Sequence, residues 1–194
     1  MNEIQLIRSQ LTAERRHASA VADACVSALR REEADAAPGS PAFGEFRQVC
    51  VDYLVCVLAW FEERDQRLAD LAHTRLEPTD PARRALEEVL ARPGRSREAL
   101  EKLEAACAAG SASGCDSTLK GRWQDFARYF GNVWGTRRDG LDALFAVNTR
   151  VRDWRSVGGI DADSILEERQ RYARVCALLP PGVSLTAAPA PGAG

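Results

Sequence analysis

The stretch from Ile4 to Ala28, IQLIRSQLTAERRHASAVADACVSA, decides the fold class. Positions 4, 7, 11, 14, 18, 21, 25 and 28 recur at alternating steps of three and four, and all but one of them are apolar: Ile4, Ile7, Leu11, Ala18, Val21, Cys25 and Ala28. This spacing places them on one face of an α-helix, close to a heptad seam. Glu14 falls on the same seam, where its neighbours are apolar. We therefore expect a long helix that carries a carboxylate on its buried face.

The rest of the chain repeats this helical pattern in blocks that prolines separate, since a proline inside a helix is strongly destabilising. Long helices are predicted over residues 3–36, 43–75, 117–152 and 161–179. The third is expected to continue across the glycines at 131 and 135, because its apolar register survives there. Residues 79–110, interrupted by Arg92-Pro93-Gly94, predict two short helices and a Gly/Ser loop.

Together these blocks predict an all-α fold, an antiparallel up-down four-helix bundle with an inserted short helical hairpin at 79–110. The 194 residues suit one domain, which we place at residues 1–179. The tail, residues 180–194, is rich in Pro, Gly and Ala and has no apolar pattern. We expect it to be disordered.

The composition sets limits on function. Apolar residues make up 45% of the chain and charged residues 28%, an ordinary balance for a soluble protein. The net charge of -2 argues against a nucleic-acid binder that neutralises phosphates. No stretch approaches the roughly 18 apolar residues of a membrane span, and the first residues lack the pattern of a secretory signal. We expect a cytoplasmic protein that binds neither nucleic acid nor membranes.

Glu14 requires an explanation, because a lone buried charge is very costly. One hypothesis is a structural ion pair with Arg137, or with Arg138 beside it, that holds the bundle in register. Another is that Glu14 points to solvent. A third is a metal site, built from carboxylates and His on facing helices.

For the metal hypothesis, the candidate ligands come from the first two helices. Counting equal lengths from the turn near residue 38 places Glu14 beside Glu62 and Glu63. His17 lies one turn beyond Glu14 on the same helix. The predicted ligand set is therefore Glu14, His17, Glu62 and Glu63.

The segments ERRH (residues 14–17) and WFEERDQRL (residues 60–68) resemble the hemerythrin-like family of four-helix bundles. In that family, a His on the first helix and a second helix bearing His and Glu bind a non-haem di-iron centre. The resemblance implies iron as a cofactor, with His17 and either Glu62 or Glu63 among its ligands. Since the chain has only two His, it implies a degenerate or rebuilt site rather than an oxygen-carrying one.

No motif indicates an enzyme, since the chain has neither a G-x-S-x-G elbow nor a phosphate-binding glycine loop followed by lysine. Two functions remain. The first is a non-enzymatic hemerythrin-like bundle with a carboxylate-rich metal or small-ligand site in its core. The second is a metal-free helical interaction or adaptor protein, which binds a protein partner or forms a homodimer.

Overall fold

The computed structural model describes residues 3–34, 41–75, 77, 82–110, 117–133, 150–158 and 162–185. These residues form helices and, among themselves, no β-strand. The helices are α1 (Glu3–Ala34), α2 (Pro41–His73), α3 (Ala82–Gly110), α4 (Ser117–Val133), α6 (Val151–Gly158) and α7 (Ala162–Ala177). The all-α class is confirmed. No described helix has the length and apolarity that crossing a membrane requires.

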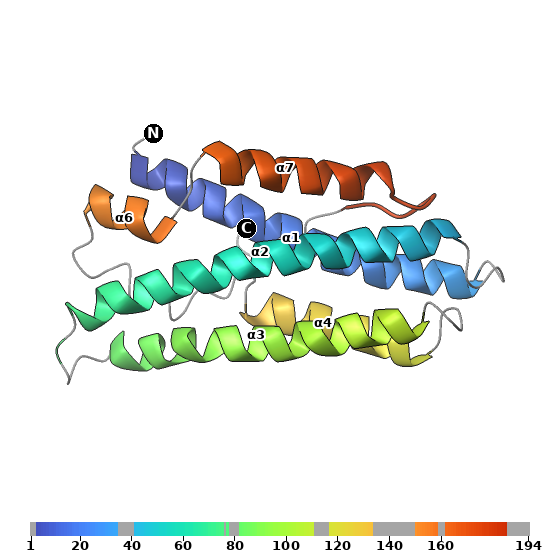
Figure 1. The fold of residues 1–194 in the computed structure, drawn as a ribbon, viewed down its shortest axis with the longest axis horizontal. Coiled ribbons are helices and arrows are strands. Elements are labelled where there is room, and N and C mark those ends of the chain that lie inside the picture. The colour runs from blue at the N-terminus through green and yellow to red at the C-terminus, as the bar shows by residue number, and fades with distance from the viewer. Residues whose placement is uncertain are drawn as a thin grey trace, which may run out of the picture.

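The long helices lie lengthwise beside one another (Figure 1). Helix α1 packs against α2 and α4, and α3 also packs against α2 and α4. Helix α7 lies along α2 and touches α1, while the short α6 packs on α1 and α2. The seam predicted for the first helix is buried at Leu11, Ala18, Val21, Cys25 and Ala28, whereas Ile4 and Ile7 are only partly buried. Helix α2 buries Phe46, Cys50, Tyr53, Val57 and Phe61 at helical spacing.

The segment predicted as an inserted hairpin is instead one helix. Helix α3 continues through Arg92-Pro93-Gly94 without a break. A proline in a helix interior costs about 3 kcal/mol, but α3 packs along both α2 and α4 and buries Leu100 and Leu103. The burial of such side chains contributes about 1.5–3 kcal/mol each. Tertiary packing thus overrides the local helix-breaking signal.

The helix predicted over residues 117–152 does not reach its expected end. Arg150 is not helical, and α6 starts anew at Val151. The backbone N–H of Arg150 donates to the Asp153 carboxylate at 2.6 Å, an N-terminal capping contact. The prediction that the helix continues from Gly131 to Gly135 is not tested beyond Val133, because residues 134–149 are outside the described residues. Arg137 is among them.

Part of the predicted disordered tail packs on the bundle. Residues 180–185 form a turn in which the Val183 N–H donates to the Pro180 carbonyl at 3.0 Å, and Val183 is buried in the main core. Gly182 makes the turn possible with a φ of 73°, in the left-handed region that favours glycine. Arg31 of α1 donates to the Pro181 carbonyl at 3.2 Å. The end of the tail, 186–194, is outside the described residues.

Candidate functional site

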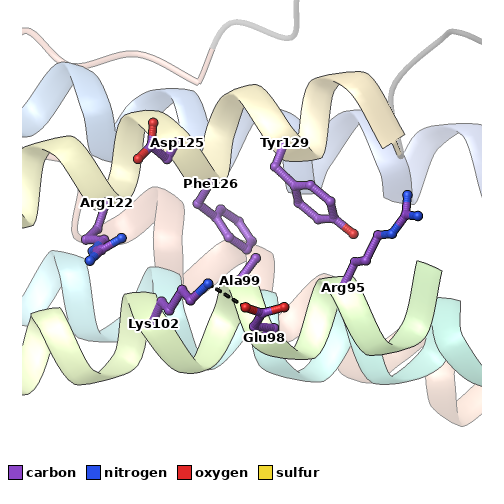
Figure 2. Close-up of a pocket in the computed structure, with 8 residues that line it drawn as sticks. All are labelled: Arg95, Glu98, Ala99, Lys102, Arg122, Asp125, Phe126 and Tyr129. Atoms are coloured by element: carbon purple, nitrogen blue, oxygen red, sulfur yellow. Dashed lines mark hydrogen bonds and ion pairs between the residues drawn. The ribbon is translucent and has the colours of Figure 1, made fainter. Parts of the chain in front are cut away.

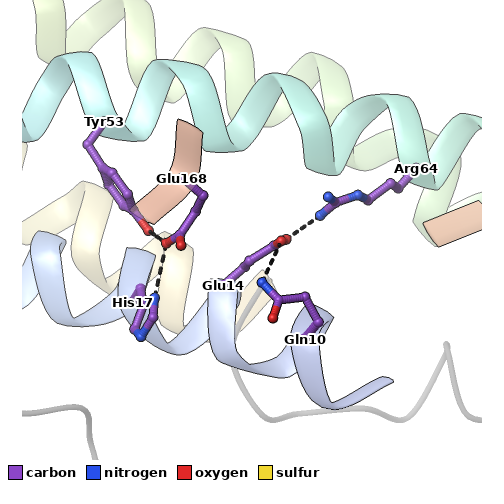
Figure 3. A network of polar contacts seen from close by, with 6 residues as sticks. All are labelled: Gln10, Glu14, His17, Tyr53, Arg64 and Glu168. Carbon is purple, nitrogen blue, oxygen red and sulfur yellow. Dashed lines mark hydrogen bonds and ion pairs between the residues drawn. The ribbon is translucent and has the colours of Figure 1, made fainter. Parts of the chain in front are cut away.

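Glu14 lies inside the protein and is paired. The residue is 1% exposed and Arg64 of α2 is 7% exposed. Arg64 Nη1 donates to Glu14 Oε2, and Gln10 Nε2 donates to Glu14 Oε1 at 3.2 Å (Figure 3). The hypothesis that Glu14 points to solvent is therefore wrong. The described partner is Arg64, whereas Arg137 lies outside the described residues.

A signal for Arg64 was present in the sequence. The buried positions of α2, at Tyr53, Val57 and Phe61, continue at helical spacing to Arg64. Arg64 thus occupies a seam position on α2, just as Glu14 does on α1. The count from the turn reached the adjacent Glu62 and Glu63, and so found the correct level of the helix but missed the residue that faces Glu14.

A second buried ion pair joins the same two helices near their connection. Arg47 of α2 donates to Glu32 of α1, and both residues are buried. Arg47 lies about as far after the connection as Glu32 lies before it, and Arg64 and Glu14 are related in the same way. Two buried pairs therefore agree on one register of α1 against α2.

A third polar cluster attaches α7 to these helices. Glu168 of α7, almost fully buried, accepts a hydrogen bond from the Tyr53 hydroxyl at 2.8 Å and lies 3.0 Å from His17 Nδ1. Tyr172 of α7 stacks on the His17 ring, with centroids 4.1 Å apart and an interplanar angle of 15°. Figure 3 shows His17, Tyr53 and Glu168 converging from three helices. A single carboxylate thus fastens α7 to α1 and α2.

The charge state of this cluster follows from its contacts. Burial works to raise the pKa of Glu168, but hydrogen bonds from His17 and Tyr53 outweigh it, so that the pKa lies below its usual value. Burial, together with the neighbouring Glu168 carboxylate, raises the pKa of Tyr53 far above its usual value. Glu168 is therefore an anionic acceptor and Tyr53 a protonated donor near neutral pH. A carboxylate in this position also makes His17 Nδ1 the protonated ring nitrogen.

The four predicted metal ligands are not brought together. Glu14 pairs with Arg64 and His17 with Glu168, as above. Glu62 contacts Arg97 of α3 at 3.3 Å, and the exposed Glu63 pairs with Arg67 one turn along α2. Within the described ranges, no group of three or more His, Cys, Asp or Glu is placed to hold a metal ion. The arrangement of these four side chains does not fit an iron centre. That the protein binds iron stays a prediction, and elemental analysis of the purified, tag-free protein tests it.

One turn from Glu14, a pocket of about 480 Å³ lies between α1, α6 and the start of α7. Its apolar lining consists of Leu6, Ile7, Trp154 and Ile165, and its polar lining of Glu3, Gln10 and Arg155. Trp154 is 3% exposed, and its helix is held near the end of α2 because Arg75, in the turn after α2, donates to both Asp153 carboxylate oxygens, at 2.7 and 2.8 Å.

The Asp153 interaction has an electrostatic consequence. Hydrogen bonds from Arg75, and from the Arg150 backbone, lower the pKa of Asp153. On the other side of the pocket, Arg155 donates to both carboxylate oxygens of Glu3. Ion pairs thus link α6 to Arg75, just after α2, and to Glu3 of α1, and the exposed Glu3–Arg155 pair is the weaker of the two.

The resemblance to hemerythrin-like proteins stays a prediction from the sequence. No protein family model, no curated protein and no solved structure matches this chain.

Proposed function

We propose that this protein is a non-enzymatic helical binding protein that takes up a small apolar molecule between α1, α6 and α7. The observation that carries the proposal is the pocket of about 480 Å³ lined by Leu6, Ile7, Trp154 and Ile165. Small-molecule sites are concave, mostly apolar and usually about 300–1,000 Å³ in volume, with a few polar groups that orient the ligand. In this proposal, α1 to α4 form the antiparallel up-down bundle that supports the site.

The polar group best placed to orient a ligand is Gln10. Its Nε2 donates to the buried Glu14, so the side-chain amide is held in one orientation. Gln10 Oε1 has no hydrogen-bond partner among the described residues and is an acceptor. The expected ligand is therefore an apolar body that carries one N–H or O–H donor. In this account the Glu14–Arg64 pair supports the site without touching the ligand.

Exposure at the pocket mouth supports the same conclusion. Leu6 is 51% exposed although it is a large apolar side chain. A single exposed leucine is ordinary by itself, but Leu6 also lines the pocket. A bound apolar molecule would cover this side chain and remove its surface from water.

The test uses N-phenylnaphthylamine, an apolar fluorescent probe with one N–H donor. The expected result is saturable binding to the full chain, which Ile165→Trp abolishes by filling the pocket. The neighbouring Leu166→Trp is the matched control, because Leu166 is exposed and does not line the pocket. The proposal is rejected if the protein shows no saturable binding or if both variants bind the probe as the unmodified chain does.

A further inference from the structure

A second pocket, of about 350 Å³, lies on a different part of the molecule, between α3 and α4. Figure 2 shows that α3 contributes one wall and α4 the other. It shares no lining residue with the apolar pocket, and none of the residues predicted from the sequence as site residues belongs to it. Its chemistry differs too, because charged and aromatic side chains line it together.

The floor of this groove is aromatic and firmly held. Phe126 is 2% exposed, and its ring contacts those of Trp123 and Phe130, with centroid distances of 6.3 and 6.2 Å. The Tyr129 hydroxyl lies 3.0 Å from Ser96 Oγ of α3, and Ser96 is fully buried. Packing and a hydrogen bond thus hold two rings at the groove before any ligand arrives.

The rim of the groove carries an excess of positive charge. Arg95, Lys102 and Arg122 line it, against Glu98 and Asp125, although the whole chain has a net charge of -2. Lys102 and Arg122 come from opposite walls at one end of the groove, and Arg95 lies at the other end (Figure 2).

These cations differ in whether they are already paired. Lys102 pairs with Glu98 at 2.6 Å, and Asp125 pairs with Arg128 at 3.2 Å rather than with Arg122. Among the described residues, neither Arg95 nor Arg122 has an ion-pair partner. Exposed pairs such as Glu98–Lys102 are weak, about 1 kcal/mol or less, so a ligand can displace them. Both arginines are available to an anion.

We propose that this groove binds a small aromatic anion, an aromatic ring that bears a carboxylate or phosphate. The ring packs against Tyr129, which is partly exposed, and against the small part of Phe126 that reaches the groove, since offset and edge-on aromatic contacts are favourable. The anionic group lies at the end where Arg122 and Lys102 face each other, and Arg122 offers it the planar donor fork that matches a carboxylate or phosphate. The volume suits a ligand of one or two rings.

The test measures binding of naphthoate to the full chain by titration calorimetry. Naphthylmethanol, which has the ring without the charge, and inorganic phosphate, which has the charge without a ring, are the comparisons. We expect each to bind at least about fivefold more weakly than naphthoate, because an exposed charge contact and a ring contact each contribute about 1 kcal/mol. Naphthoate binding should weaken as salt is raised, whereas naphthylmethanol binding should not.

Two variants with the same change of charge locate the site. Arg122→Gln is expected to weaken naphthoate binding about fivefold. Arg174→Gln, at an exposed position of α7 outside the groove, should leave the affinity unchanged. Ile165→Trp should also leave it unchanged, which separates this groove from the apolar pocket. No saturable naphthoate binding, equal affinity for naphthylmethanol, or equal effects of Arg122→Gln and Arg174→Gln would overturn the proposal.

Discussion

The two helix pairs of this protein are joined by different means. Helices α1 and α2 bury two ion pairs, Glu14 with Arg64 and Glu32 with Arg47. Both pairs also pack apolar side chains into the core, and the buried contribution of α3 and α4 is aromatic and aliphatic: Leu100, Leu103, Trp123, Phe126 and Phe130. Apolar packing is non-directional, so on its own it tolerates a small displacement of one helix along its neighbour. A buried charge that slips from its partner is left uncompensated at high cost, and we infer that the two pairs specify how α1 and α2 align.

The largest expected effect follows from breaking one pair. Arg64→Met leaves the Glu14 carboxylate buried without its cation, which should lower the free energy of unfolding by about 3–5 kcal/mol. Arg67→Met, one turn along the same helix, removes an exposed pair with Glu63 and an exposed hydrogen bond to the Ser156 carbonyl at 3.3 Å, and should cost about 1 kcal/mol. Urea unfolding followed by circular dichroism measures both. Similar losses for the two variants would contradict this account of α1 and α2.

A smaller effect is expected where α7 meets α1 and α2. Since the pKa of Glu168 is lowered in the folded protein, its carboxylate stabilises the fold above the unfolded pKa of about 4.3. That stabilisation is lost as the pH falls through the folded pKa. Glu168→Gln should therefore cost about 1–2 kcal/mol near pH 7 and flatten the melting temperature between about pH 5 and pH 3.

The matched control is Glu167→Gln, because Glu167 lies beside it on α7 and is exposed. Its main ionic contact is with Arg171, at 2.9 Å on the same helix. This variant should retain the acid dependence of the unmodified protein. An unchanged profile for Glu168→Gln would show that Glu168 does not fasten α7 in this way.

The aromatic layer of α4 should be more tolerant. Phe130 is fully buried, but Phe130→Leu keeps the site apolar and much of its volume, so the expected loss is about 1.5 kcal/mol or less. Phe130→Gln, which buries an unsatisfied amide, should cost clearly more. Urea unfolding compares the two. If Phe130→Leu costs as much as Arg64→Met, the contrast between the two helix pairs does not hold.

The smallest effect is expected at the turn after α7. Gly182 has a φ of 73°, and a Cβ added there would lie 2.3 Å from Arg31 Nη1. Gly182→Ala should cost about 1 kcal/mol, because the left-handed conformation is strained for other residues and Arg31 has to move. Ser184→Ala, at an exposed position, should leave the melting temperature unchanged. A neutral Gly182→Ala would mean that the turn is not held against α1.

The sequence predicted those features that depend on periodicity. The buried face of α1, including Glu14, follows from the spacing of apolar residues alone. Where local signals competed with packing, prediction failed: Pro93 indicated a helix end, yet α3 continues because its neighbours α2 and α4 pack along it. A helix-breaking residue such as Pro93 indicates the local free-energy cost of continuing the helix. It carries no information about the stabilisation that packing against other helices provides.

The sequence predicted which part of α2 lies beside Glu14, but it did not predict which residues contact Glu14 and His17. Arg64 continues the α2 seam and was recoverable from spacing, whereas Glu168 meets His17 only because α7 crosses back over α1, 151 residues along the chain. Periodicity on one helix does not determine which distant helix covers it. For the same reason, the two pockets were not apparent, since each is formed by helices that are brought together only in the folded chain.

The central claim is that Glu14 and Arg64 form a structural ion pair that aligns α1 with α2. A double-mutant cycle tests it most directly, with the free energy of unfolding measured for Glu14→Leu, Arg64→Met and the two together. Replacing a buried pair by apolar residues is often neutral or stabilising. We therefore expect each single variant to lose about 3–5 kcal/mol and the double variant to recover most of that loss. Additive losses, or single variants as stable as the unmodified protein, would contradict the claim.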